Sequence, residues 1–288
     1  MAVASGWVGS SAKAETGEAM MSAAATKLRI TARPFMMSAM VGQSVEISQA
    51  LTVGANTAYA NTALTAAANA LANRAITNLT ITVTGVVISN ATGNPCFLFA
   101  NAAPWSEFKS IHLVINSGCR VSGRGGNGAS LTMTGGTFKS FIEATAGGPG
   151  ITNNIGTKLR ITNNGVISGG GGGGGGAAFQ NNDDSDNGAA GGGGCPLGAA
   201  GVRGATNNGG VSGAAGTATG AGAGASDSGS SNTSKAGNGG AWGTAGGAGS
   251  SIGGSGNKKT SGGGAAGAAL NGTAPTWTTV GTINGSRL

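Results

Sequence analysis

The sequence predicts a mixed fold, with a small α+β N-terminal domain followed by a glycine-rich polyglycine-II helix bundle, or sandwich, that carries variable loops at its distal end. Two observations predict it. Only seven of the sixty glycines precede Gly118, so a half of ordinary composition is joined to a half dominated by glycine. Within the second half, glycine runs such as residues 169–176 alternate with polar, irregular insertions. The two halves must therefore be stabilised in different ways.

The glycine-rich half needs hydrogen bonds between backbones, because large apolar residues are few after Gly169. Ordering glycine costs about 0.5–1 kcal/mol per residue more than ordering alanine. A three-residue-per-turn extended helix has no internal hydrogen bonds, so its N–H and C=O groups are free to pair with neighbouring helices. We therefore predict polyglycine-II helices packed side by side. A collagen triple helix is not expected, since no Gly-X-Y register persists and proline is scarce.

The first fifty residues predict a compact docking segment. Ser10 or Ser11 could cap a helix over residues 12–27, and Pro34 could begin a second helix that runs to about residue 51. The second pattern has more apolar surface than one buried stripe needs, and methionine is common at adaptable binding surfaces. These side chains form either ordinary core or a partner-binding face. They are Phe35, Met36, Met37, Met40, Val41 and Val45.

A small β layer is expected next, after a weak helix within residues 52–73. Alternating apolar residues predict strands between residues 76 and 88, at 96–99 and at 111–115. A repeat then links the halves. Leu113, Ile115, Val121 and Ser122-Gly123 recur with identical spacing as Leu159, Ile161, Ile167 and Ser168-Gly169. Each copy is typical of a strand, a turn, a short strand and a glycine run, so the β layer should lead into glycine helices.

The order of runs and insertions predicts a binding tip. If successive glycine runs go up and down the bundle, many of the insertions gather at one end, as recognition loops do on a rigid scaffold. The insertions are residues 129–146, 177–187, 205–212, 225–235 and 255–261. The predicted domains are residues 1–121, residues 122–272 for the bundle with its loops, and residues 273–288 as a strand that returns to the β layer.

Composition argues against several classes of protein. Charged residues make up 9% of the chain, and its lysines and arginines are scattered with a single tyrosine, so no nucleic-acid-binding stripe is expected. No apolar stretch of about 20 residues predicts membrane insertion, and no signal peptide is expected at the N-terminus. Three cysteines without metal-ligand spacing suggest synthesis in a reducing cytosol and no disulfide framework.

Motifs for catalysis or metal binding are weak. Gly123, Gly125 and Gly128 match G-x-G-x-x-G, but no helix start follows, so a dinucleotide site is not expected. The oxygen-rich residues 181–187 lack the order of a calcium loop and favour a solvated loop. A Ser-His-Asp triad would need His112, the only histidine, and no strand-turn-helix nucleophile elbow precedes any serine. With no second histidine and no nearby cysteine pair, a core or surface histidine is favoured over a metal ligand. The sequence thus predicts no enzyme, no cofactor and no metal.

Several short stretches of the sequence, taken together and in their order, indicate a protein family more specifically than any one of them does alone. They are SGWVGSSA at 5–12, KLR at 27–29 with PFMMS at 34–38, GQSV at 42–45, GRGGNG at 123–128, GGPGI at 147–151 with KLRI at 158–161, and residues 277–285. In these stretches the chain resembles the receptor-recognising tip adhesins of the long tail fibres of T-even-type bacteriophages.

This resemblance implies a virion protein, made in the host bacterial cytoplasm and placed at the tip of the long tail fibre. One copy per tip would cap the trimeric distal shaft protein. Loops of a polyglycine-II sandwich would bind a porin-type outer-membrane protein of a Gram-negative host, with lipopolysaccharide left open as a further contact. Trp7 matches the family's attachment tryptophan, and Met36 stands where a second tryptophan is expected. The predicted fibre-attachment residues are Trp7, Val8, Phe35, Met36, Met37 and Met40.

Within the loops we expect exposed aromatic anchors and charged discriminators, since aromatic rings supply contact area and charges supply specificity. The predicted receptor-binding residues are Thr134, Thr137, Phe138, Phe141, Phe179, Asn181, Asp183, Asp184, Asn207, Asn208, Asn232, Lys258 and Lys259. Two alternative functions stay open at this point. One is a fibre-assembly chaperone that departs after the shaft folds, and the other is a glycine-rich structural or ice-binding protein.

Overall fold

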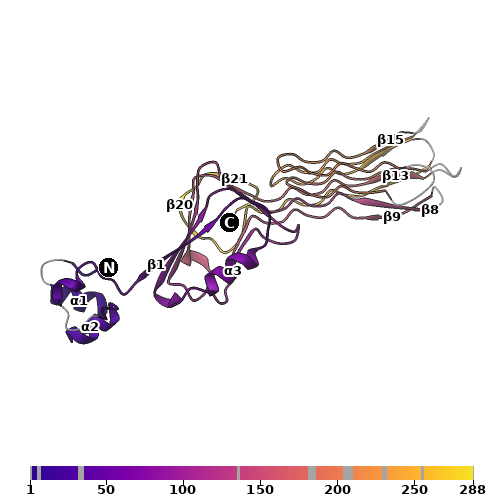
Figure 1. Ribbon diagram of the computed structural model, residues 1–288. Coiled ribbons are helices and arrows are strands. Elements are labelled where there is room, and N and C mark those ends of the chain that lie inside the picture. Colours follow the sequence, from indigo (N-terminus) through magenta and orange to yellow (C-terminus); the bar gives the residue numbers. More distant parts are fainter. Residues whose placement is uncertain are drawn as a thin grey trace.

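The molecule is elongated, with a helical unit, a β body and a glycine-rich bundle following one another along its length (Figure 1). The computed structural model describes residues 2–4, 8–31, 36–134, 137–180, 186–203, 210–228, 232–253 and 256–287. The described elements are mostly β, and none of the helices in these ranges has the length and apolar character needed to cross a bilayer.

The helical unit contains α1 (Val8–Thr16), α2 (Met21–Lys27) and the 3-10 helix η1 (Met37–Met40). The single helix predicted over 12–27 is two helices, because Gly17 adopts a left-handed backbone with φ of 74°. The helix predicted over 34–51 is wrong in its described part, where a short 3-10 turn leads into strand β1. The unit has a small core of its own, made of Val3, Ala12, Ala24, Ala25, Leu28 and Met40.

The β body is a solenoid with three parallel sheets. Each turn of the chain contributes one strand to the first sheet and one to the second, and some turns also contribute a strand to the third. The first sheet is ordered β1 (Ile47–Val53), β3 (Thr77–Val83), β6 (Ser110–Ile115), β11 (Leu159–Asn163) and β20 (Thr276–Thr279). The second is ordered β2 (Asn56–Tyr59), β4 (Val86–Ser89), β7 (Arg120–Ser122), β12 (Val166–Ser168) and β21 (Thr282–Asn284). The third is ordered β19 (Leu270–Gly272), β10 (Ile151–Asn153) and β5 (Phe97–Phe99). Helix α3 (Asn61–Asn69) and the 3-10 turns η2 (Arg74–Ile76) and η3 (Gly156–Lys158) lie between strands.

Apolar side chains in register fill the interior of the β body. Ile81, Leu113 and Ile161 are partners on neighbouring strands, and all are fully buried. The repeat in the sequence aligned Leu113 with Leu159, whereas the sheet pairs Leu113 with Ile161. A shift of two residues keeps the same side chains inside, since strand side chains alternate with period two. The final strands β20 and β21 return to this body and pair with β11 and β12.

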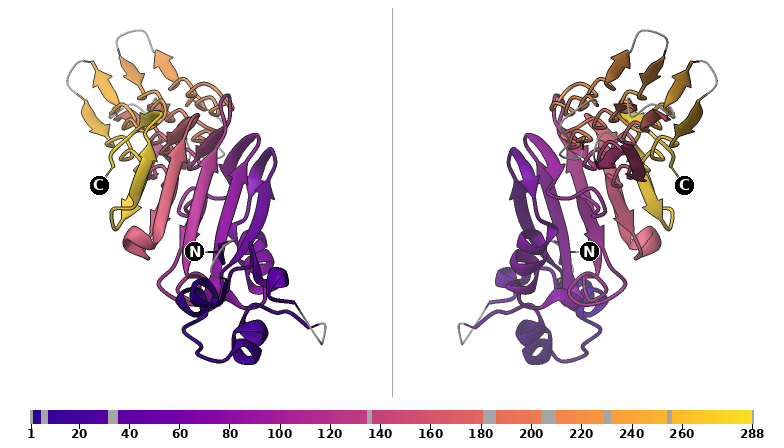
Figure 2. Two further views of the ribbon diagram at one scale, coloured as in Figure 1. Left: turned by 90° about the vertical axis from the view of Figure 1, so that its left-hand side faces the viewer. Right: turned by 90° about the vertical axis from the view of Figure 1, so that its right-hand side faces the viewer.

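The bundle is formed by two excursions of the chain, residues 123–150 between β7 and β10 and residues 169–269 between β12 and β19. Backbone hydrogen bonds show that successive segments run alternately away from the body and back towards it. These segments are residues 123–129, 145–150, 169–176, 189–195, 198–201, 213–216, 222–225, 236–240, 244–249 and 261–267. Figure 2 shows them extending beyond the parallel strands of the body.

Residues 169–176 lie among the other segments, and their N–H groups donate to three neighbouring segments in turn. The donor and acceptor pairs are Gly170–Gly148, Gly171–Cys195, Gly172–Thr244, Gly173–Thr145, Gly174–Gly192 and Gly175–Gly247, at 2.6–3.0 Å. The carbonyl groups accept from three other segments with the same repeat. These pairs are Gly170–Gly267, Gly171–Gly126, Gly172–Gly240, Gly173–Gly264, Gly174–Ala129 and Gly175–Gly237. Hydrogen bonding around this run therefore repeats every three residues.

The spacing between segments leaves no room for side chains. A Cβ atom on Gly172 would lie 1.9 Å from the carbonyl oxygen of Gly264, and one on Gly174 would lie 2.0 Å from that of Gly237. By contrast, nothing lies within 4 Å of a Cβ placed on Gly262. Glycine is therefore required where segments pack on all sides and is replaceable at the margin.

Arg120 joins the β body to the bundle. Its guanidinium lies 3.9 Å from the ring centroid of Trp242, which belongs to a turn between two bundle segments. Its Nη1 also donates to the Oγ of Ser168 at 3.1 Å. Burial lowers the pKa of Arg120. The two regions are thus connected by a cation–π contact as well as by the chain itself.

Short strands form the far end of the bundle (Figure 1). They are β8 (Ser130–Thr134), β9 (Thr137–Ile142), β13 (Ala177–Gln180), β14 (Asn187–Ala189), β15 (Ser226–Ser228), β16 (Thr233–Lys235), β17 (Ser250–Ile252) and β18 (Asn257–Thr260). They pair as a β8–β9 hairpin and as two antiparallel sheets, ordered β14-β13-β18 and β15-β16-β17. Most of them derive from the polar insertions of the sequence, while β17 and most of β14 come from stretches that were predicted as glycine runs.

Candidate functional site

Two surfaces at opposite ends of the molecule are candidates for binding. We call the first the distal surface, which comprises β8, β9 and β13 to β18 together with residues 202–203 and 210–212. The second is the helical unit. The glycine-rich bundle and the β body separate them (Figure 1).

The aromatic residues of the distal surface are buried or half-buried, and two of them belong to a small core. Phe138 is 7% exposed and packs against Phe141, with ring centroids 4.7 Å apart, above Leu131 and Met133. Phe179 is 1% exposed. The expectation of exposed anchors is therefore wrong for Phe138 and Phe179, because the insertions must bury apolar area to hold their hairpins in place. Phe141 is half-buried.

Two carboxylates hold the backbone of the distal surface. Asp186 is 4% exposed, and its Oδ2 accepts a hydrogen bond from the N–H of Phe138 at 2.8 Å. The Oδ2 of Asp227 accepts from the N–H groups of Gly188 at 2.9 Å and Gly210 at 3.0 Å. Sequence reasoning did not identify either role. Asp186 lies in the oxygen-rich stretch that was assigned to a solvated loop, and a backbone acceptor has no sequence signature in such a loop.

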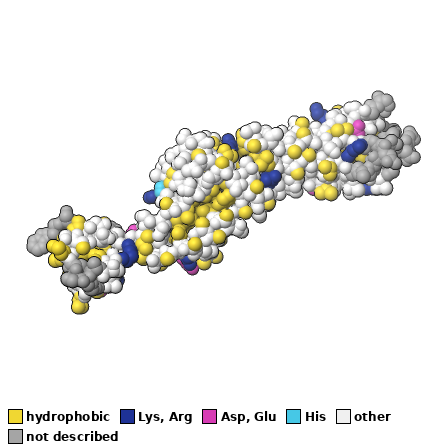
Figure 3. All heavy atoms as spheres, viewed as in Figure 1, with side chains coloured by type: hydrophobic (Ala, Val, Ile, Leu, Met, Phe, Trp, Pro, Cys, Tyr) yellow, Lys and Arg dark blue, Asp and Glu magenta, His cyan; other side chains and the backbone are white. Residues whose placement is uncertain are grey.

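The exposed side chains of the distal surface are largely cationic or polar. Lys139, Lys235, Lys258 and Lys259 are exposed on β9, β16 and β18. Figure 3 shows Lys and Arg side chains at the surface of this end. Exposed apolar side chains accompany them, with Ile142 66% and Ile252 71% exposed. Such a surface offers both contact area and charge to a partner.

The structure brings several predicted receptor-binding residues together on the distal surface. Thr134 is exposed, while Thr137 and Asn232 are half-buried. The carbonyl oxygen of Asn232 accepts from the Nδ2 of Asn187 at 3.2 Å. Five other predicted residues, Asn181, Asp183, Asp184, Asn207 and Asn208, lie outside the described residues.

The helical unit exposes methionines that its core does not need. Met20, Met36 and Met37 are 69%, 76% and 50% exposed. Figure 3 shows hydrophobic side chains at the surface of this unit. Met40, a predicted attachment residue, is instead fully buried, because η1 turns it into the small core. Val8 is half-buried against the same core, and Trp7 and Phe35 lie outside the described residues.

Few side chains in the part of the chain that the structure describes are arranged for catalysis or metal binding. No group of three or more metal-ligating side chains occurs among those residues. The three cysteines are free and buried, and burial raises the pKa of Cys96 to about 12 and that of Cys195 to about 11. A protonated thiol is a poor nucleophile, so neither cysteine is activated.

Comparison with known proteins relates both ends of the chain to phage fibres. A family model described as the phage tail fibre adhesin Gp38 N-terminal domain matches residues 1–41, and one described as phage tail fibre adhesin Gp38 matches residues 48–288. The receptor-recognizing protein gp38 of Salmonella phage S16 is 38% identical over 167 residues, which cover 58% of this chain and 60% of that protein. The match thus spans less than two thirds of that relative's length.

The structure is also similar to a solved one. The crystal structure of the gp37-gp38 adhesin tip complex of the bacteriophage S16 long tail fiber matches with a TM-score of 0.61 at 35% identity, over 100% of both chains. The predicted resemblance to phage fibre-tip adhesins, and with it a place on the virion, is confirmed. The chain belongs to the phage tail fibre adhesin family Gp38.

Proposed function

We propose that this adhesin caps the end of a trimeric tail fibre shaft and binds a bacterial surface receptor through the distal surface. One observation carries the proposal: the described strands β8, β9 and β13 to β18, most of which come from the polar insertions, gather at the end of the bundle furthest from the helical unit. The printed names agree, since the relative is a receptor-recognizing protein and the structural neighbour is a tip complex of gp37 and gp38.

The helical unit is the proposed attachment surface, with one copy per fibre tip. Methionine is flexible and polarizable, so Met36 and Met37 could adapt one surface to the end of a shaft whose own chains are related by three-fold symmetry. Val8 supports them from the small core. Trp7 and Phe35 keep their predicted place in this contact.

The bundle is proposed to be a true polyglycine-II assembly. The three-residue repeat of hydrogen bonds along residues 169–176 supports this, because an extended helix with three residues per turn turns each successive amide toward another neighbour. Such a bundle holds the distal surface away from the shaft without a side-chain core.

The receptor is proposed to be a porin-type outer-membrane protein, with Phe141, Thr134, Thr137, Asn232, Lys258 and Lys259 among the contacts. The exposed lysines of β18 would favour acidic loops on the receptor. Asn181, Asp183, Asp184, Asn207 and Asn208 remain part of this proposal. Phe138 and Phe179 support the contact surface from beneath and are not contacts themselves.

Exchange of loops tests the receptor proposal. Residues 129–146 and 205–212 would be replaced by those of a relative with another host, and adsorption of the phage would be measured on both hosts. We expect adsorption to follow the loops. The control is the variant Arg124→Gln, which changes a half-buried arginine of the bundle outside both proposed binding surfaces and should leave the host unchanged. Adsorption that stays with the original host after the loop exchange would contradict the proposal.

The place of the protein in the particle separates an adhesin from an assembly chaperone. We expect mass spectrometry of purified virions to detect the chain at a fixed ratio to the fibre shaft protein. A shaft that is complete while the chain is absent from infectious virions would favour the chaperone.

A further inference from the structure

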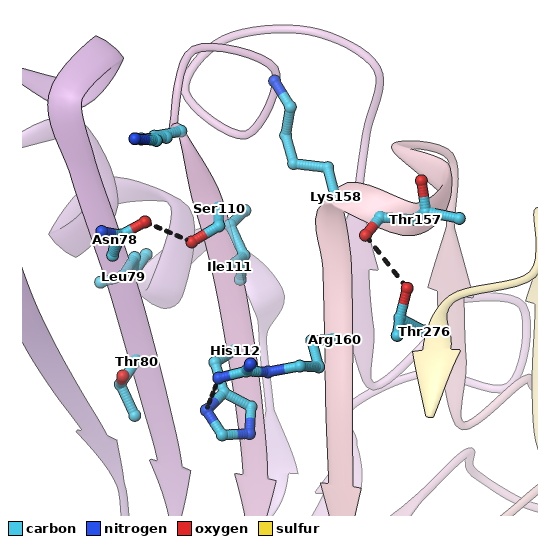
Figure 4. A pocket seen from close by; sticks show the side chains of 11 residues that line it. Asn78, Leu79, Thr80, Ser110, Ile111, His112, Thr157, Lys158, Arg160 and Thr276 are labelled. Carbon is cyan, nitrogen blue, oxygen red and sulfur yellow. Dashed lines mark hydrogen bonds between the residues drawn. The ribbon is translucent and has the colours of Figure 1, made fainter. Parts of the chain in front are cut away.

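A polar groove lies on the outer face of the first sheet of the β body, away from both proposed binding surfaces. It has a volume of about 670 Å³ and crosses β3, β6, β11 and β20 (Figure 4). The side chains that define it are Asn78, Ser110, His112, Lys158, Arg160 and Thr276. Figure 3 shows the histidine beside cationic side chains on the part of the body nearer the helical unit.

The strands hold these groups in fixed positions. Outward residues such as Ser110 and His112 alternate with Ile111, which is fully buried in the core of the solenoid. The Oγ of Ser110 donates to the Oδ1 of Asn78 at 2.6 Å, and the Oγ1 of Thr276 donates to the carbonyl oxygen of Thr157 at 3.4 Å. A groove built on a packed sheet is preorganised for a ligand, which lowers the entropic cost of binding.

The charge in the groove is positive and uncompensated. Within the described residues, neither Lys158 nor Arg160 has a carboxylate partner. The Nζ of Lys158 donates to the carbonyl oxygen of Ser106 at 2.6 Å, and one N–H of Arg160 donates to the Nδ1 of His112 at 3.2 Å. A guanidinium has five N–H donors, so most of those of Arg160 are available to a ligand.

A carboxylate beside the groove does not offset this charge. Glu46 forms an ion pair with Lys109, which also lines the groove, and accepts from the Nδ2 of Asn78 at 2.8 Å. The hydrogen bonds from Lys109 and Asn78 lower the pKa of Glu46, so it remains charged and paired with Lys109. Lys158 and Arg160 therefore carry the net positive charge of the groove.

We propose that this groove binds a phosphorylated oligosaccharide of the bacterial surface, with Arg160 and Lys158 on the phosphate and the amide and hydroxyl groups on sugar hydroxyls. Arginine pairs with phosphate through two parallel hydrogen bonds. A groove of this volume is far larger than one phosphate, and its lining of Asn78, Ser110 and Thr276 matches the hydrogen-bonding groups of a sugar. The choice of a bacterial saccharide rests on the proposed function, which brings the adhesin to that surface.

Because His112 is the only histidine in the chain, its ring resonances report on this groove alone. The full-length chain, without a polyhistidine tag, would be titrated by NMR with three probes. These are the phosphorylated core oligosaccharide of lipopolysaccharide, the same oligosaccharide after dephosphorylation, and inorganic phosphate. We expect saturable shifts with the first probe and at least about tenfold weaker binding of the other two, as expected when a charge-assisted hydrogen bond is lost.

Substitutions test whether Arg160 and Lys158 bind the phosphate. Arg160→Gln and Lys158→Gln should each weaken binding of the phosphorylated probe about tenfold, while the matched variant Lys13→Gln should not change it. Equal melting temperatures would show that the variants are folded. The inference is overturned if the phosphorylated probe leaves the His112 resonances unmoved, if dephosphorylation has no effect, or if inorganic phosphate binds as tightly as the oligosaccharide. If the unaltered chain does not bind the phosphorylated probe while adsorption still follows the distal loops, the groove is rejected and the proposed function is kept.

Discussion

The β body and the glycine-rich bundle are two stiff structures made in opposite ways. The body buries in-register side chains such as Ile81, Leu113 and Ile161, each contributing about 1.5–3 kcal/mol through its burial. The bundle has almost no side chains between its segments, and a typical backbone hydrogen bond contributes only about 0.5–1.5 kcal/mol. It compensates by number, since successive residues of the run 169–176 both donate and accept. A protein can thus extend a rigid rod without extending a hydrophobic core.

The largest effect is expected from one methyl group in the centre of the bundle. In Gly172→Ala the new Cβ would lie 1.9 Å from a backbone oxygen, so segments must separate. The loss of stability should exceed the about 1–3 kcal/mol that is usual for an added core methylene. The matched control is Gly262→Ala, where the Cβ meets open space. Thermal unfolding measures both, and equal melting temperatures would refute close packing of the bundle.

The junction should be next in importance. Arg120→Ala removes the cation–π contact with Trp242 and the hydrogen bond to Ser168, a loss of about 1–2 kcal/mol. Hydrogen exchange should become faster in the adjoining bundle segments than in the core of the body. Arg124→Ala is the control, because that side chain makes no hydrogen bond or ring contact among the described residues. Uniform exchange in both variants would show that Arg120 does not couple the regions.

A smaller effect should stay within the body. Ile161→Val removes one methylene from a fully buried position and should cost about 0.5–1.5 kcal/mol in unfolding free energy. Ile252→Val, at a position 71% exposed on the distal surface, should change stability by no more than about 0.5 kcal/mol. Chemical denaturation of both variants measures the difference, which would vanish if the solenoid interior were loosely packed.

The smallest effect is a titration on the outer face of the body. Burial, followed by the charge of Arg160, lowers the pKa of His112 below its ordinary value of 6.5. The stability that neutral His112 contributes is therefore complete above pH 6.5 and is lost as the pH falls through the folded-state pKa. NMR should find a midpoint below 6.5 that rises in Arg160→Gln. A midpoint that is unchanged in the variant would exclude the influence of Arg160.

The bundle could be predicted from the sequence because the chemistry leaves few choices. Where side chains are missing, only backbone hydrogen bonds can hold segments together. Long glycine runs such as 169–176 therefore predict this kind of packing. The alternation of runs and insertions likewise predicted that β8, β9, β13, β15, β16 and β18 meet at one end, whereas β17 and most of β14 come from predicted glycine runs. The parallel solenoid was not predicted, because periodicity identifies a strand and does not identify its partner. Partners such as β7 and β12 are separated by a long excursion into the bundle.

The errors at individual residues concern burial and hydrogen bonding to the backbone. Phe138 and Phe179 were assigned to an exposed surface because they stand in polar insertions, and Met40 because its stretch has more apolar residues than one buried stripe needs. Each of the three side chains is instead buried: Met40 in the core of the helical unit, Phe138 in the core beneath the β8–β9 hairpin, and Phe179 on β13. Asp186 and Asp227 were missed because their partners are backbone amides, which carry no signal in the sequence.

The lengthwise course of the bundle segments has a mechanical consequence. Pulling the distal surface away from the helical unit would load neighbouring segments along their axes, so their lateral hydrogen bonds would resist together in shear and would not open one by one. Tension between a bound cell and the particle would thus be shared among neighbouring segments through their lateral hydrogen bonds, and the β body would receive it at the four points where the two excursions leave and re-enter it.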